Sequence, residues 1–138
     1  MTFRPERYPA NWKALREGVL LRANNACERC RVANGELISR GVAGDAGTYQ
    51  TFEGYIFDED TGEYLGRTSL SDYEGGKALR VVLTVAHLDH NEAHNDSSNL
   101  AALCQLHHLR HDAADNARRR RESRARGQEV LPGLGGTR

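Results

Sequence analysis

The sequence lacks any apolar run long enough to form a membrane-spanning helix. Its first residues, MTFRPERYPANW, also lack the apolar segment of a secretory signal. Both absences predict a cytoplasmic protein with no membrane contact. Cysteine is scarce as well, and the odd number of three residues argues against a disulfide framework. We therefore expect the cysteines to be metal ligands, nucleophiles or core residues.

Net charge is absent too, because 19 lysine and arginine residues balance 19 aspartate and glutamate residues. The charges are nonetheless separated along the chain. Eight acidic residues and one arginine lie between Asp45 and Glu74, whereas seven arginines and three acidic residues lie between Arg110 and Arg126. A basic end of this kind indicates contact with nucleic-acid phosphates. A solvated helix face that aids solubility is the alternative interpretation.

The chain of 138 residues suits a single α+β domain with a modest core. Apolar residues at helical spacing predict a helix over residues 11–23, which Asn11 could cap. A second, basic helix is expected from about residue 105 to 123. We expect the domain to span residues 1–122, followed by a flexible basic and glycine-rich tail at 123–138.

Between these helices, glycine and small residues predict a loop over 34–47. An inserted β-hairpin is expected at about residues 45–76. Its first arm lies between Tyr49 and Phe57, its second arm covers residues 63–68, and Asp58–Gly62 supplies the turn.

Residues 79–88, LRVVLTVAHL, form the clearest predicted strand. Its alternate residues Val81, Leu83, Val85 and His87 share one face, which is apolar until its last member. An isolated histidine at such a position is usually a core-edge residue. All six histidines of the chain, however, lie between His87 and His111. This clustering favours a functional site.

Two short pairs of residues have the spacing of metal ligands: Cys27-x-x-Cys30 and Cys104-x-x-His107. Together they offer three sulfurs and one nitrogen, a normal tetrahedral set for structural zinc. An ion held by both pairs would tie the end of the first helix to the start of the second. A redox role for the first pair would need a thioredoxin-like context, which is not visible, and buried core cysteines are the other alternative.

The segment from His87 to Asp112 reads HLDHNEAHNDSSNLAALCQLHHLRHD. It resembles the HNH endonuclease family, whose members combine a strand ending in Asp-His or His-His, a loop, Asn-Leu, and Leu-Cys-x-x-Cys-His at the start of a helix. Here the matching positions are His87, Asn99-Leu100, and Leu103-Cys104 with His107-His108. The resemblance covers residues 11–31 and 80–112. It implies a small zinc-containing ββα-metal fold, or His-Me finger, of the phage and bacterial type.

What the resemblance implies is a metal-dependent endonuclease that cuts DNA, most readily double-stranded DNA. His87 would be the general base that takes a proton from water. Asn99 would fix the loop and orient His87, and His108 would bind a divalent ion on the scissile phosphate. Asp112 would be a second ligand or a partner of the ligands. Mg, Mn, Ni and Zn stay open for this ion, because a mixed histidine and carboxylate site does not select sharply.

One departure from the family pattern concerns the metal ligands. Ala86 precedes His87, at a position where the family often has an Asp or His ligand. Asp89 or His90 would then supply the missing ligand, or Asp89-His90 would itself be the working pair, with His90 as the base. Ala86 also motivates a second hypothesis, a catalytically weak or inactive zinc-stabilised DNA-binding module.

The second departure is His107, which replaces the family's fourth cysteine and leaves His107 and His108 open to exchanged roles. RNA instead of DNA is a third possibility for the substrate, since both are phosphodiesters. Family context adds a role in phage DNA packaging or restriction, with the partner proteins of those systems; the sequence leaves the oligomeric state open. A clamp on the DNA backbone is expected from five arginines: Arg110, Arg118, Arg119, Arg120 and Arg121.

Overall fold

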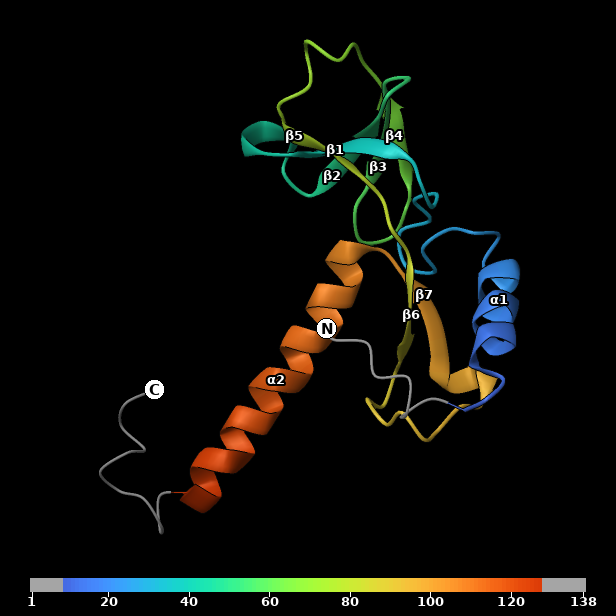
Figure 1. Ribbon diagram of the computed structural model, residues 1–138. Coiled ribbons are helices and arrows are strands. Elements are labelled where there is room, and N and C mark those ends of the chain that lie inside the picture. Colours follow the sequence, from blue (N-terminus) through green and yellow to red (C-terminus); the bar gives the residue numbers. More distant parts are fainter. Residues whose placement is uncertain (1–8, 128–138) are drawn as a thin grey trace.

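The computed structural model of the protein describes residues 9–127 and has a mixed α+β fold with antiparallel sheets. A two-stranded sheet of β6 (Thr84–His87) and β7 (Leu100–Leu103) lies between two helices (Figure 1). Helix α1 (Trp12–Arg22) packs on one side, and the first turns of α2 (Gln105–Gly127) pack on the other. The core lies at this junction and includes the three cysteines.

The expected first helix is confirmed, and its apolar stripe packs as predicted. Val19 is buried, and Trp12, Leu15 and Leu20 pack against the core. Asn11 precedes the helix but its side chain makes no capping hydrogen bond. Asp96 caps the short 3₁₀ helix η3 (Ser97–Asn99) instead, where its side chain accepts a hydrogen bond from the Ser98 backbone N–H.

The inserted region is larger than the expected hairpin. It is a five-stranded antiparallel sheet in the order β4-β3-β2-β1-β5, drawn at the top of Figure 1. The bounds of its strands are β1 (Leu37–Gly41), β2 (Thr48–Thr51), β3 (Tyr55–Asp58), β4 (Tyr64–Arg67) and β5 (Gly75–Arg80). The β3–β4 hairpin was expected, but the predicted first arm divides into β2 and β3, which a turn ending at Gly54 separates.

The predicted loop over residues 34–47 is wrong, because it contains β1 and a 3₁₀ turn, η2 (Ala43–Asp45). Its glycines and small residues suggest a loop, yet β1 is the inner strand that pairs with both β2 and β5. Ile38 provides the reason: it is 2% exposed and lies opposite Thr51 and Leu79. A single buried side chain in a short strand leaves little periodicity in the sequence.

The predicted strand over residues 79–88 is divided between the two sheets. Strand β5 ends at Arg80, and β6 begins at Thr84. The residues between them keep the alternation of a strand, since Val81 and Leu83 are buried and Val82 is exposed. The backbone N–H groups of Val81 and Leu83, however, donate to the loop that follows the Cys27–Cys30 segment, and that of Val82 donates to the Gln105 side chain. The sequence pattern therefore predicts burial correctly and strand pairing incorrectly.

The expected second helix is confirmed but is longer than predicted. Helix α2 continues to Gly127, so the expected domain boundary at residue 122 falls within it. The remainder of the predicted tail, 128–138, lies outside the described residues, as do residues 1–8. Within residues 9–127, neither helix combines the length and the apolarity that crossing a membrane requires.

A tight contact joins the five-stranded sheet to the segment that carries the first two cysteines. Gly62, in the β3–β4 turn, has φ +79°, and a Cβ added there would lie 2.6 Å from the Cys30 carbonyl oxygen. Gly35 has a similar φ of +80° but no atom within 4 Å of its added Cβ. The two glycines therefore share a backbone requirement and differ in their surroundings.

We predict that Gly62→Ala lowers the free energy of unfolding more than Gly35→Ala does. Gly35→Ala should cost roughly 1–2 kcal/mol, the penalty of a left-handed alanine. Gly62→Ala adds the displacement of the Cys30 carbonyl to the same penalty. Urea unfolding of both variants measures the difference, and equal losses would contradict the contact.

Candidate functional site

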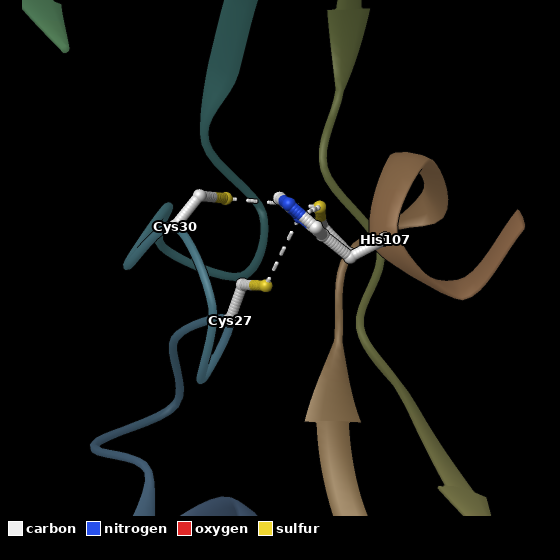
Figure 2. Close-up of side chains that lie close together, drawn as sticks. Cys27, Cys30 and His107 are labelled. Atoms are coloured by element: carbon white, nitrogen blue, oxygen red, sulfur yellow. Dashed lines mark hydrogen bonds between the residues drawn. The ribbon is translucent and has the colours of Figure 1, made fainter. Parts of the chain in front are cut away.

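Four metal-binding side chains meet where α1, β7 and α2 come together. Cys27 and Cys30 lie in the loop after α1, Cys104 follows β7, and His107 lies in the first turn of α2. Their ligand atoms all lie within 4.8 Å of one another, and all four residues are buried. Figure 2 shows the Cys27 and Cys30 side chains directed toward the His107 imidazole.

The distances within this Cys₃His cluster match those around one tetrahedral ion. Two thiolates on a zinc with Zn–S bonds of about 2.3 Å lie about 3.8 Å apart. The Cys30 and Cys104 sulfurs are 3.8 Å apart. His107 Nδ1 lies 3.3 Å from the Cys104 sulfur and 3.8 Å from the Cys27 sulfur. The residues thus fit the predicted structural zinc site, with His107 as its nitrogen ligand.

Backbone hydrogen bonds hold the two cysteine-bearing segments together. Glu28 N–H donates to the Ala102 carbonyl at 2.9 Å, and the Glu28 carboxylate accepts from Ala102 N–H at 2.9 Å. The Tyr49 hydroxyl, from β2, donates to the Cys30 carbonyl at 3.0 Å. The pKa of the Cys27 thiol is lowered by hydrogen bonds from the thiols of Cys104 and Cys30. An ion bound at the cluster would displace the thiol protons.

Arg40 reaches this cluster from β1 of the five-stranded sheet. One of its terminal nitrogens, Nη2, lies 3.7 Å from the Cys104 sulfur, and the other, Nη1, lies 3.7 Å from Glu59 Oε1. That second nitrogen is buried and has no hydrogen-bond partner. A zinc ion with three thiolates and a neutral imidazole would carry one net negative charge, which the part-buried Arg40 guanidinium would balance.

A second cluster lies further along α2, and we call it the His–Asp cluster: His90, His108, His111 and Asp112. Both His90 Nε2 and His108 Nε2 face the Asp112 carboxylate, at 3.5 and 3.6 Å. These two imidazole nitrogens are buried and have no hydrogen-bond partner. The His111 ring stacks on the His90 ring, with 4.2 Å between centroids. The structure thus brings together three of the four residues expected for the catalytic ion.

The spacing in the His–Asp cluster is looser than in the Cys₃His cluster. Within residues 9–127, Cys₃His is the one group of three or more such side chains whose ligand atoms all lie within 4.8 Å. His90 has a left-handed backbone with φ 59°. Such a conformation is uncommon for a residue other than glycine and is found more often at functional sites.

Asp89, the fourth expected ligand, lies apart from this cluster and belongs to the loop between β6 and β7. Its carboxylate accepts from Asn99 Nδ2 at 2.9 Å and lies 2.7 Å from His94 Nδ1. Hydrogen bonds from His94 and Asn99 hold the pKa of Asp89 well below its ordinary value. Asn99 also donates to the His94 carbonyl. Asn99 therefore fixes this loop, and its predicted part in orienting His87 stays a prediction.

His87 ends β6 and is 8% exposed, with its ring stacked on Trp12 at 5.3 Å between centroids. Its Nε2 lies 2.9 Å from Asn95 Oδ1. Because Asn95 Nδ2 donates to the Glu92 carbonyl, the amide presents its oxygen to His87. Neutral His87 then carries its proton on Nε2 and its lone pair on Nδ1.

The residue that contacts the His87 ring in the loop is therefore Asn95, and the sequence analysis did not single it out. The sequence gives little reason to choose Asn95, because it is one of several polar residues in the loop between β6 and β7. The His87 carbonyl lies 3.2 Å from His111 Nε2. This contact joins the end of β6 to α2 beside the His–Asp cluster.

The arginines expected to clamp DNA differ in what they contact. Arg110 pairs with Glu59 and Asp60 of the β3–β4 turn. Arg118 and Arg119 both pair with Asp115, a buried residue of α2. Within the described part of the chain, Arg120 and Arg121 form no ion pair, and both are exposed. These last two are the expected clamp residues that are available to an external phosphate.

Comparisons of the chain with protein-family models, with curated proteins and with solved structures find no match. The resemblance to HNH endonucleases therefore stays a prediction that depends on the motifs. What the structure itself provides is a buried Cys₃His cluster able to hold a metal ion and, on the same helix, a group of histidines and an aspartate.

We predict that the purified protein binds one zinc per chain at the Cys₃His cluster and loses structure without it. Chelation, or Cys30→Ser, should lower the melting temperature, because structural zinc contributes several kcal/mol to folding. Zinc release should increase as the pH falls, since protons compete for the thiolates. Metal analysis combined with circular dichroism measures both effects. A zinc-free protein with an unchanged melting curve would contradict this role.

We also predict that Arg40→Met weakens zinc binding by about tenfold, as the loss of a residue that supports the ligands typically does. Arg80→Met is the matched control, because Arg80 lies on β5 and donates to the Gly35 carbonyl. Competition with a chromophoric chelator gives both affinities. Equal affinities in the two variants would show that Arg40 does not stabilise the centre.

Proposed function

We propose that this protein is a metal-dependent endonuclease of the HNH type that hydrolyses DNA phosphodiester bonds. The observation that carries the proposal is the order β6, β7, α2, two antiparallel strands followed by a helix. This order puts His87 at the end of the first strand and His108 one residue beyond the zinc ligand His107. Both are the positions that the family pattern requires.

In this proposal the catalytic ion binds to the His–Asp cluster, through His90, His108 and Asp112. The support is the pair of buried, unpartnered imidazole nitrogens that face one carboxylate. Buried polar atoms are rarely left without a partner, and a cation would satisfy both nitrogens. Imidazole and carboxylate ligands accept Mg, Mn, Ni or Zn. The ion would bind the scissile phosphate and stabilise the leaving oxygen.

His87 is the proposed general base, and Asn95 sets the nitrogen that acts. With the Nε2 proton donated to Asn95 Oδ1, Nδ1 accepts a proton from water. The water oxygen forms a bond to phosphorus while the bond to the sugar oxygen breaks, and that oxygen then takes a proton from solvent. Trp12, stacked on the ring, limits its rotation. Arg120 and Arg121 would bind the DNA backbone without reading its sequence.

One observation favours the alternative of a zinc-stabilised DNA-binding module without catalysis. Ala86 is 2% exposed, belongs to the core, and lies opposite Ala101 in the β6–β7 pair. No ligand replaces it at this place in the fold, so the site depends on His90 from the following loop. Measuring DNA cleavage distinguishes this alternative from the proposed endonuclease. The alternative predicts salt-dependent DNA binding and no metal-stimulated cleavage.

We predict that the purified protein nicks or cuts plasmid DNA in the presence of Mg²⁺, Mn²⁺ or Ni²⁺ and that EDTA stops the reaction. His87→Ala should lower the rate about 10²–10⁴-fold, the usual contribution of a general base. His94→Gln is the control histidine, since His94 is half-exposed and lies in the loop pair with Asp89. Gel electrophoresis of the products, with a structured RNA as second substrate, measures the rates.

Full activity of His87→Ala would exclude the proposed base and favour His90. Cleavage of RNA but not DNA would correct the substrate. Binding of DNA without cleavage under every metal would favour the alternative function.

A further inference from the structure

Asp115 is a buried carboxylate in a part of α2 that is otherwise mostly exposed. It is 6% exposed, while Ala114, Asn116 and Arg118 around it are all exposed. Burying a carboxylate is unfavourable unless it is paired. The sequence analysis assigned no role to this residue, and the proposed reaction does not use it.

The partners of Asp115 lie on two sides of its carboxylate. Oδ1 lies 3.5 Å from Nδ1 of His90. Arg118 also pairs with Oδ1, and Arg119 Nε lies 2.9 Å from Oδ2. The two arginines balance the buried charge and fix the carboxylate on the helix. The remaining side of Asp115 therefore faces the His90 ring.

His90 lies between two carboxylates of α2, one on each ring nitrogen. Its Nδ1 faces Asp115 and its Nε2 faces Asp112, each at 3.5 Å. The His111 ring stacks on it with an interplanar angle of 8°. The ring plane and both ring edges are thus constrained by residues of α2, although His90 itself belongs to the β6–β7 loop.

We infer that Asp115 is the positioning residue of His90. Because the two carboxylates lie at equal distances, Asp115 favours the proton on Nδ1 and Asp112 favours it on Nε2. An ion bound at Nε2 takes the lone pair of that nitrogen, and Asp115 then accepts the proton of the neutral ring from Nδ1. Histidine ligands of metals are commonly held in this way by an outer carboxylate, which fixes the tautomer and increases the basicity of the ligand. Arg118 and Arg119, which are exposed, then support the ion-binding site by neutralising Asp115, and Arg120 and Arg121 are left to contact DNA.

This inference rests on the proposed catalytic ion, so its test has one readout that needs no second metal. In zinc-loaded protein at neutral to mildly alkaline pH, ¹⁵N NMR of the imidazoles reports the tautomer of His90. We expect the fraction of the Nδ1–H form to fall in Asp115→Ala, because Asp112 then remains as the carboxylate that faces the ring. Asp115→Asn keeps an acceptor oxygen and should retain most of the Nδ1–H form.

The second readout is the affinity for Ni²⁺, titrated calorimetrically into the same zinc-loaded proteins. Asp115→Ala should weaken binding about 10–100-fold, the usual effect of removing such a carboxylate. Asp115→Asn should fall between Asp115→Ala and the wild type. Glu122→Gln is the matched control, because Glu122 also pairs with Arg118, at 3.2 Å, but makes no contact with His90. We expect it to bind Ni²⁺ as the wild type does.

The outcomes separate this inference from the proposed function. If the wild type binds Ni²⁺ and Asp115→Ala binds it equally, with an unchanged tautomer, the positioning role is overturned and the ion site stands. If the wild type binds no second ion, the proposed catalytic ion is wrong and Asp115 has no ligand to position. If Asp115→Ala does not fold, the His90 tautomer and the Ni²⁺ affinity are compared with the wild type in Asp115→Asn and in the double variant Arg118→Ala/Arg119→Ala.

Discussion

The rest of the structure depends on the Cys₃His cluster, in which three thiols and one imidazole from segments far apart in the sequence lie close enough to bind a single ion. The segments are the loop after α1, the end of β7 and the first turn of α2. The buried core gathers around them, and the part of α2 beyond Asp115 is largely exposed. An ion at this position would therefore join segments that are far apart in the sequence and add to the stability that the apolar core provides.

The same constraint sets the geometry of the candidate catalytic groups. His107 and His108 are adjacent in the first turns of α2. An ion bound by His107 would therefore fix the orientation of this part of the helix, and with it the directions of His108 and of Asp112 one turn later. From the other side, β6 brings His87 to the same helix, where its carbonyl contacts His111. In the proposed function, the first centre would stabilise the helix and the second would use the side chains that the helix then presents.

Some of this arrangement could be predicted from the sequence, and the reason lies in the range of each interaction. Ligand spacing and helical periodicity are local, so the Cys₃His set and both helices were predicted correctly. Strand partners are non-local, so β1 was missed, and the continuous pattern of residues 79–88 concealed a change of sheet at Val81–Leu83. Arg40 reaches Cys104, and Asp115 reaches His90, through tertiary packing. The arginine run around Arg118 resembled a uniform DNA clamp, although Arg118 and Arg119 pair with Asp115 of the same helix.

The central claim is that α2 carries two metal centres with different tasks. Crystals of zinc-loaded protein soaked in Ni²⁺, with anomalous differences measured at the zinc and nickel absorption edges, test it most directly. The account predicts a zinc peak among Cys27, Cys30, Cys104 and His107, and a separate nickel peak in contact with His90, His108 and Asp112. A structure with zinc at the first centre and no ion at the second, at a Ni²⁺ concentration that saturates exposed histidines, would contradict it.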